Sequence, residues 1–196
     1  MQISRAAKSD TQFFISAKTR TAIPTTCGLV RDALVAASLD PSVRSIDFVP
    51  STTVAATQVN LNAIVLVRDD GRYFLDVVPA RPLRDVENEG LSLIAIEQFG
   101  LPSIVLTADD IRREPRYANS RLVWSYRLSR VGITLRMKIL QTLLDDGPMT
   151  MASLLSTVRA NQDPGPAVLA LACSNLLELD LVSRPLGPLT IVRYRA

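Results

Sequence analysis

Two stretches in the first half of the chain carry hydrophobic residues at helical spacing. Residues 28–39 (GLVRDALVAASL) are hydrophobic at positions 29, 30, 33, 34, 36 and 37, which predicts a helix of about three turns. It should end at Asp40-Pro41, because proline disfavours helical geometry in the residue before it. Residues 86–99 repeat the spacing and begin with acidic residues, which are favourable at a helix N-terminus. Two amphipathic helices are therefore expected.

Strand patterns occupy the sequence around these helices. Alternating or short apolar runs predict strands at residues 43–49, 54–59, 63–68, 73–78 and 103–107, the first ending at Pro50 and the last a short buried strand. The stretch Asp69-Asp70-Gly71-Arg72 predicts a hairpin turn. Helices that alternate with strands in this way predict an α/β domain, in which a mixed sheet is flanked by helices.

The C-terminal third has a different pattern. Helices are expected at residues 107–116, 134–144, 151–159 and 167–181, with Thr107 and Thr150 as N-caps of the first and third, and a hairpin of strands at 182–186 and 189–195. In the second of these helices, Leu135, Ile139, Leu140, Leu143 and Leu144 are expected to face inward. Three short helices followed by a hairpin are the plan of a winged helix-turn-helix domain. The chain is thus divided into an N-terminal arm (1–20), an α/β domain (21–118), a connector (119–131) and a winged helix (132–196).

Composition indicates an ordinary globular protein, with 47% hydrophobic and 21% charged residues in a chain of 196. No apolar run approaches the roughly 18 residues that a membrane-spanning helix needs. The first residues include two bases but no apolar segment after them, so no signal peptide is expected. These features predict a cytoplasmic protein without a membrane partner.

The sequence contains no histidine and two cysteines. Catalysis by Ser-His-Asp or Cys-His groups is therefore excluded, as is every zinc site that uses histidine. Cys27 and Cys173 lie far apart among small and apolar residues, and we expect both to be buried, reduced packing residues. No cofactor and no metal are predicted.

The basic residues are unevenly distributed. Residues 1–125 hold 14 Lys or Arg and 14 Asp or Glu, whereas residues 126–196 hold 8 and 5, which supplies the whole net charge of +3. Arginine accounts for 19 of the 22 bases. A preference for arginine fits contacts with phosphate groups, and GC-rich coding explains it equally well.

Three stretches resemble the TnsA-like transposon endonuclease family: CGLVRDALVAASLDPSVRSIDF, DDGRYFLDVVPA and VLTADDIRREPRYANSRLVW. The resemblance covers residue 21 to the C-terminus, and the run Arg-Arg-Glu-Pro-Arg ahead of a leucine-rich helix carries most of it. It implies that the α/β domain has the restriction-endonuclease-like fold and that a winged helix follows.

That resemblance also implies a set of catalytic positions. Such nucleases hold Mg²⁺ on a glutamate from the first helix and on two groups from the hairpin, with a lysine that positions the attacking water. The corresponding positions here are Val30, Asn62, Asp76 and Val78, and only Asp76 keeps a suitable group. The sequence offers no lysine near this hairpin. We therefore expect a catalytically inactive nuclease fold, not an enzyme.

The remaining hypothesis is binding of double-stranded DNA, with the helix at 167–181 in the major groove and the hairpin along the backbone. The candidate DNA-binding residues are Arg121, Arg127, Arg130, Arg136, Lys138, Arg159, Gln162, Ser174, Asn175, Arg184, Arg193 and Arg195. The helix itself carries no basic residue and includes Glu178 and Asp180, as a docking module would, whereas the three arginines of the connector favour DNA binding.

Three functions follow from these observations. The first is a transcriptional regulator or site-recognition factor, connected with a mobile element. The alternatives are an active endonuclease subunit of a TnsA-like transposase and a winged-helix adaptor that docks another protein. A homodimer, and a protein partner from a transposase or the transcription machinery, stay open as further partners.

Overall fold

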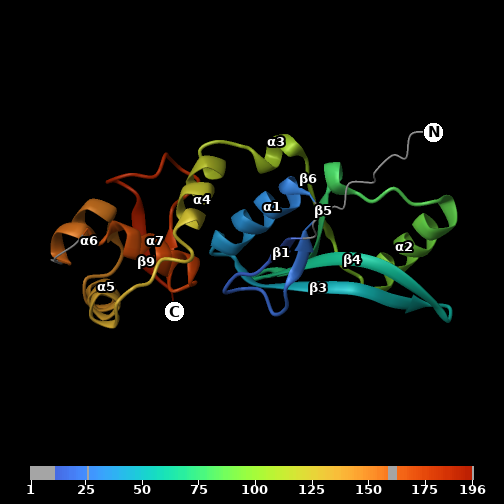
Figure 1. Cartoon of the computed structure of the whole chain (residues 1–196), viewed down its shortest axis with the longest axis horizontal. Helices are drawn as coiled ribbons and strands as arrows, with labels where there is room; N and C mark the ends of the chain where they lie inside the picture. Colours follow the sequence, from blue (N-terminus) through green and yellow to red (C-terminus); the bar gives the residue numbers. More distant parts are fainter. Residues whose placement is uncertain (1–11, 26, 159–162, 196) are drawn as a thin grey trace, which may run out of the picture.

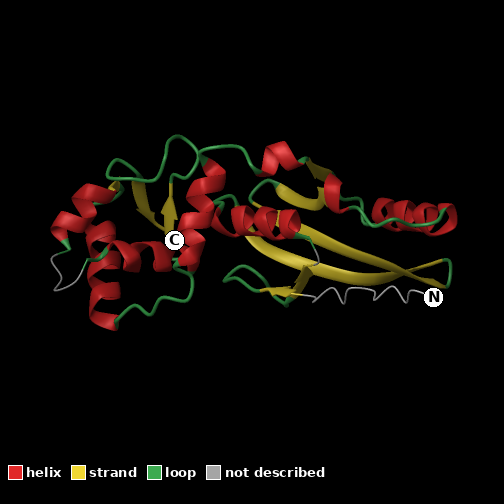
Figure 2. Cartoon of the chain, turned by 45° about the horizontal axis from the view of Figure 1, so that its top comes forward, coloured by secondary structure: helices red, strands yellow, loops and turns green. Residues whose placement is uncertain are grey.

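A mixed four-stranded sheet forms the centre of the N-terminal part of the molecule (Figures 1 and 2). The structure is a computed structural model that describes residues 12–25, 27–158 and 163–195. The strand order is β3-β4-β5-β6, with β5 and β6 parallel and the other neighbours antiparallel. The elements of this part are β1 (Gln12–Phe14), β2 (Ile23–Thr25), α1 (Gly28–Leu39), β3 (Val43–Val54), β4 (Thr57–Arg68), β5 (Gly71–Val77), the 3₁₀ helix η1 (Val78–Ala80), α2 (Val86–Gln98), β6 (Ser103–Leu106) and α3 (Ala108–Ile111). The expected α/β class, with a mixed sheet flanked by helices, is confirmed.

The hairpin of β3 and β4 is longer than its sequence pattern predicts. The pairing passes from Val49↔Ala63 to Ser51↔Asn60, so that Leu61 and Asn62 together lie opposite Pro50. The prediction that the first strand ends at this proline is wrong, because Pro50 lies in the edge strand β3 opposite the bulge in β4, where no ladder hydrogen bond needs its missing N–H. Asn62 adopts the left-handed conformation (φ 49°) that such a bulge requires.

Two hydrophobic clusters lie on this sheet. The larger places α1 against Ile46, Leu66 and Leu75, and the smaller places α2 against Val59 and Leu61 toward the tip of the long hairpin. Strand β6 forms one edge of the sheet and none of its residues is buried. The prediction of a buried strand at 103–107 is therefore wrong, because an apolar run cannot distinguish a central from an edge strand.

The C-terminal part has four helices and a small three-stranded sheet. Its elements are α4 (Arg116–Ser125), α5 (Ile133–Asp145), β7 (Met149–Thr150), α6 (Met151–Thr157), α7 (Gly165–Cys173), β8 (Leu177–Leu179) and β9 (Ile191–Tyr194). The sheet is antiparallel in the order β7-β9-β8. The predicted caps are confirmed, since Thr107 and Thr150 each accept a hydrogen bond from the third residue of the helix that follows.

The last predicted helix and hairpin differ from the observed ones. Helix α7 ends at Cys173, and β8 occupies residues that were expected to continue it to 181. Asn175 has φ 60°, which turns the chain sharply out of the helix. The partner of β9 is consequently β8, and residues 182–186 lie in the loop between these strands. In α5, Ile139 and Leu143 are buried as expected, whereas Leu144 is exposed.

Helix α4 joins the two parts and occupies most of the predicted connector. Its buried side includes Asn119, Ser120, Val123 and Trp124, and it packs on α1 and on α7. The Trp124 ring is 8% exposed and stacks on Phe14 of β1, with 5.2 Å between the ring centroids. Of the predicted arm, Phe14 therefore belongs to the core and Lys18 is buried, while residues 1–11 lie outside the described residues.

One continuous hydrophobic core results from this packing. It includes residues under α1, such as Leu34 and Ile46, and residues of the C-terminal part, such as Leu154, Val168 and Val192. Among the described helices, none has both the length and the apolar character that crossing a bilayer requires.

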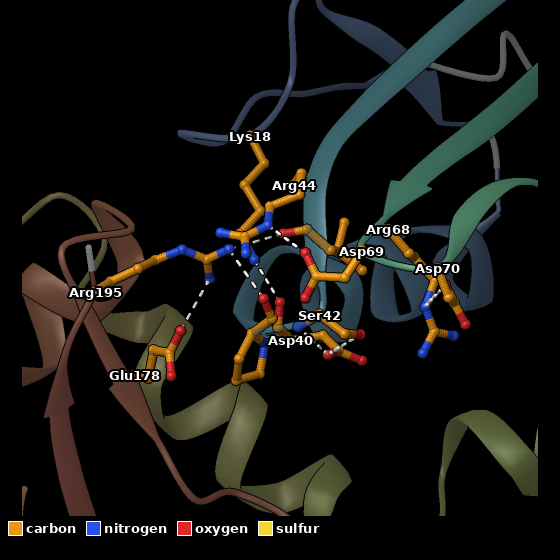
Figure 3. A network of polar contacts seen from close by, with 11 residues as sticks. Lys18, Asp40, Ser42, Arg44, Arg68, Asp69, Asp70, Glu178 and Arg195 are labelled. Atoms are coloured by element: carbon orange, nitrogen blue, oxygen red, sulfur yellow. Dashed lines mark hydrogen bonds and ion pairs between the residues drawn. The ribbon is translucent and has the colours of Figure 1, made fainter.

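Three cations contact the chain just after α1, and two of them, Lys18 and Arg195, are labelled in Figure 3. The Lys18 ammonium donates to the Asp40 carbonyl at 2.5 Å, and the Arg195 guanidinium donates to the carbonyls of Pro41 and Val43 at 2.9 and 3.2 Å. Arg116 of α4 pairs with the Asp40 carboxylate at 3.4 Å. Carbonyl groups at a helix C-terminus attract positive charge, which favours these contacts. Because Arg116 and Arg195 belong to the C-terminal part, the contacts connect it to the N-terminal part.

The burial of Lys18 predicts a pH dependence of stability. The side chain is 4% exposed, and desolvation, followed by the charge of Arg195, lowers its pKa from 10.5 to about 8. As the pH rises between these two values, the folded protein loses this proton while the unfolded chain keeps it, so the group's contribution to stability increases. We expect the unfolding free energy of Lys18→Met, minus that of the wild type, to fall as the pH is raised from about 7 to about 10.

Urea denaturation at several pH values measures this difference. The matched control is Lys138→Met, because Lys138 is an exposed lysine, and its difference from the wild type should change little across the same range. A difference for Lys18→Met that stays constant from pH 8 to 10.5 would contradict the lowered pKa.

Candidate nucleic-acid interface

A pocket of about 620 Å³ brings together three of the four positions compared with the nuclease family. Val30 of α1, Asn62 of β4 and Asp76 of β5 all line it, and Val78 lies exposed just beyond β5. The rest of the wall is mostly apolar, with side chains from α2 and the sheet such as Leu93. The residue alignment implied by the resemblance therefore corresponds to one place in the fold.

The donor set of this pocket does not fit a magnesium ion. The Arg81 guanidinium holds both oxygens of Asp76, with Nε–Oδ1 3.0 Å and Nη2–Oδ2 2.5 Å, and these bonds raise the pKa of Arg81. Val30 has no side-chain oxygen, and the other acid of the wall, Glu89, pairs with Arg84 at 3.3 Å, whereas Mg²⁺ needs several hard oxygen ligands. Within the described residues, no group of three or more His, Cys, Asp or Glu side chains is placed to hold a metal ion. We derive no chemical step through a metal here.

A strongly basic stretch runs through the centre of the molecule. Residues 112–138, which we call the basic segment, contain seven arginines and one lysine against a single acid, Glu114. The rest of the chain has four more acidic than basic residues. In Figure 1 the segment leads from the end of α3 through α4 to α5. It therefore carries more positive charge than the whole protein.

Most of this charge is not neutralised within the protein. Arg113 pairs with Asp110 and Arg116 with Asp40. The other arginines of the segment are exposed and form no ion pair with any described acidic residue; they are Arg112, Arg121, Arg127, Arg130 and Arg136. Exposed arginines without acidic partners are available to bind phosphate groups.

Two of these arginines have their guanidinium groups over aromatic rings. The Arg121 guanidinium carbon is 5.4 Å from the centroid of the Tyr117 ring, and that of Arg127 is 5.6 Å from the centroid of the Trp124 ring. Arg121 also donates to the Tyr117 hydroxyl, and Arg127 to the Trp124 carbonyl. Stacking of this kind restricts the side chain while its charge stays exposed.

The structure separates the candidate DNA-binding residues into groups. Five of them, Arg121, Arg127, Arg130, Arg136 and Lys138, lie exposed in the basic segment. Arg184 and Arg193 are exposed on the β8–β9 loop and on β9. Arg159 and Gln162 lie outside the described residues.

Arg195 has an internal position. It is 8% exposed, and besides the two carbonyls after α1 it faces Glu178 at 3.8 Å. A guanidinium buried in this way connects parts of the protein and does not reach a ligand outside it.

Helix α7 is buried along its length, contrary to its expected position in a DNA groove. Every residue from Ala167 to Cys173 is at most 9% exposed, because α4, α5 and α1 pack around it. The Ser174 hydroxyl donates to the Ala170 carbonyl, and Asn175 is half-buried. Burial raises the pKa of Cys173 to about 11, and its thiol donates to the Val123 carbonyl. Both cysteines are free, and Cys27 is only half-buried.

Comparison with known proteins was made for the whole chain. No protein-family model and no curated protein matches it.

The sequence interpretation missed one part of the basic segment. Arg112 follows α3 and is exposed without an acidic partner among the described residues, yet it was not among the candidates. The charge was compared between residues 1–125 and 126–196, and the excess of basic residues spans that boundary. A count over a sliding window would have included Arg112.

Proposed function

We propose that this chain is a non-catalytic protein that binds double-stranded DNA through the basic segment. The observation that carries the proposal is the set of five exposed arginines without acidic partners among the described residues, on a stretch with a single acid. Phosphate groups are spaced closely along a duplex, and arginines that neutralise them release bound counterions.

The arrangement of the C-terminal part supports the interpretation as a winged helix. The chain order is α5, β7, α6, α7, β8 and β9, and β9 lies between β7 and β8. We propose that the N-terminal part is a restriction-endonuclease-like domain, which the mixed sheet with α1 on one side supports. Under this proposal the protein is related to the TnsA-like family by fold and acts in gene regulation or on a mobile element.

The proposal of a pseudo-nuclease rests on Asp76. Its two oxygens are occupied by Arg81, and the neighbouring Val30 and Asn62 bring no negative charge to the pocket. An arginine therefore supplies the positive charge that this carboxylate would otherwise receive from a metal ion. DNA would therefore be held and not cut.

Salt titration of DNA binding tests the proposed function. If all five unpaired arginines contact phosphates, log Kobs should fall with log salt concentration with a slope of about −4.5, from about −0.9 for each phosphate neutralised. Fluorescence polarisation with a labelled short duplex between about 50 and 200 mM salt measures this slope. Absence of binding at about 50 mM salt, or binding that is insensitive to salt, would overturn the proposal.

A further inference from the structure

The basic segment has no exposed aromatic ring on which a base could stack. Its three aromatic residues are Tyr117, Trp124 and Tyr126. Trp124 lies between Phe14 and Arg127. Tyr117 is covered by Arg121, and its hydroxyl donates to Asp32 of α1 at 3.3 Å. Tyr126 packs against the core. Proteins that hold single strands combine a positive groove with free stacking rings, and this segment offers only the positive charge.

The helix that would read base edges in a winged-helix domain is also buried. A recognition helix must place side chains in the major groove, and α7 is covered by α4, α5 and α1. At its end, Ser174 uses its hydroxyl within the helix. In the neighbouring loop, the carbonyl groups of Leu181 and Arg184 accept hydrogen bonds from the Asn119 amide at 2.9 and 2.8 Å, which fixes the loop against α4.

We infer that the protein binds the backbone of duplex DNA without preference for base sequence. This inference rests on the proposed function and narrows it to one class of ligand. The Arg121 and Arg127 guanidinium groups lie over the Tyr117 and Trp124 rings, and these contacts restrict how far the two side chains extend from the protein surface. Contacts with phosphates position a protein on DNA but carry no sequence information.

A selection from a randomised duplex library tests sequence independence. The full chain is incubated with the library, and bound DNA is recovered and sequenced over successive rounds. We expect no enriched motif, and affinities for unrelated duplexes within about threefold of one another, where a specific protein shows about a thousandfold or more. An enriched motif that binds about 100-fold more tightly than a scrambled duplex would overturn the inference and leave the proposed DNA binding intact.

Competition between forms of nucleic acid tests whether the protein prefers duplex DNA. A single strand and an RNA duplex of the same sequence are each expected to compete less well than duplex DNA. Tighter binding of either would overturn the inference. If no nucleic acid binds, the proposed function itself fails, which is a distinct result.

Two variants compare the contribution of the basic segment to DNA affinity with that of Ser174 at the end of α7. Ser174→Ala should leave the affinity for duplex DNA within about twofold of the wild type, since this hydroxyl bonds within its own helix. Arg130→Gln should lower the affinity equally for all sequences and reduce the salt slope by about 1. A loss that depends on sequence in either variant would contradict backbone binding.

Discussion

Replacement of Arg121, Arg127, Arg130 and Arg136 by glutamine is expected to weaken binding to duplex DNA by about 100- to 1,000-fold at low salt. Glutamine keeps much of the side-chain length but removes the charge, so the counterion release that drives binding is lost at four positions. The salt slope should fall by about 0.9 for each phosphate contact removed. Fluorescence polarisation at several salt concentrations measures both quantities.

A matched control has the same change in net charge elsewhere. Arg20, Arg31, Arg44 and Arg72 lie outside the basic segment, and their replacement by glutamine should lower affinity by no more than about tenfold. Arg130 and Arg136 make no side-chain hydrogen bond, ion pair or ring contact with other described residues. The double variant at these two positions should therefore fold normally and still lose affinity. Equal losses in the four-residue variant and its control would show that net charge alone matters.

Trp124→Ala is expected to lower the free energy of unfolding by about 3–5 kcal/mol. The ring is almost completely buried, stacks on Phe14 and belongs to the core shared by both parts of the molecule. Its removal leaves a cavity at the junction and also removes the surface on which Arg127 lies. Urea denaturation followed by far-UV circular dichroism measures the change, because the variant lacks the chain's only tryptophan.

Trp124→Phe serves as the control. It keeps a ring to stack on Phe14, so it should cost less than half as much stability as the alanine variant. In the wild type, tryptophan fluorescence and circular dichroism should report the same single transition, since one core includes both parts. Two separated transitions, or an alanine variant as stable as the wild type, would contradict the shared core.

Local sequence patterns predicted the elements whose boundaries depend on neighbouring residues. Helix α1 has the predicted bounds, because its apolar spacing and the following Asp40-Pro41 act within one or two turns. The caps at Thr107 and Thr150 are equally local. Patterns failed where distant residues decide the outcome. At Pro50, the bulge in the neighbouring strand β4 lets β3 continue past the proline.

The same distinction applies to the candidate interface. Charge along residues 112–138 can be counted from the sequence, and so can the lack of carboxylates at Val30 and Asn62. The exposure of an arginine cannot be derived from the sequence. Arg130 lies at the surface, whereas Arg195 is buried against the carbonyls of Pro41 and Val43. Both arginines were equal candidates because their local sequences do not specify what packs on them.

By itself, the sequence determined the helical and strand segments of the α/β part, the absence of histidine chemistry and the positive charge of the C-terminal third. Only the tertiary structure decided that α4 packs between α1 and α7, that Arg81 forms an ion pair with Asp76 and that α7 is buried. The physical reason is that propensity and charge belong to single residues and near neighbours, whereas burial and ion pairing arise between segments that folding brings together from distant parts of the chain.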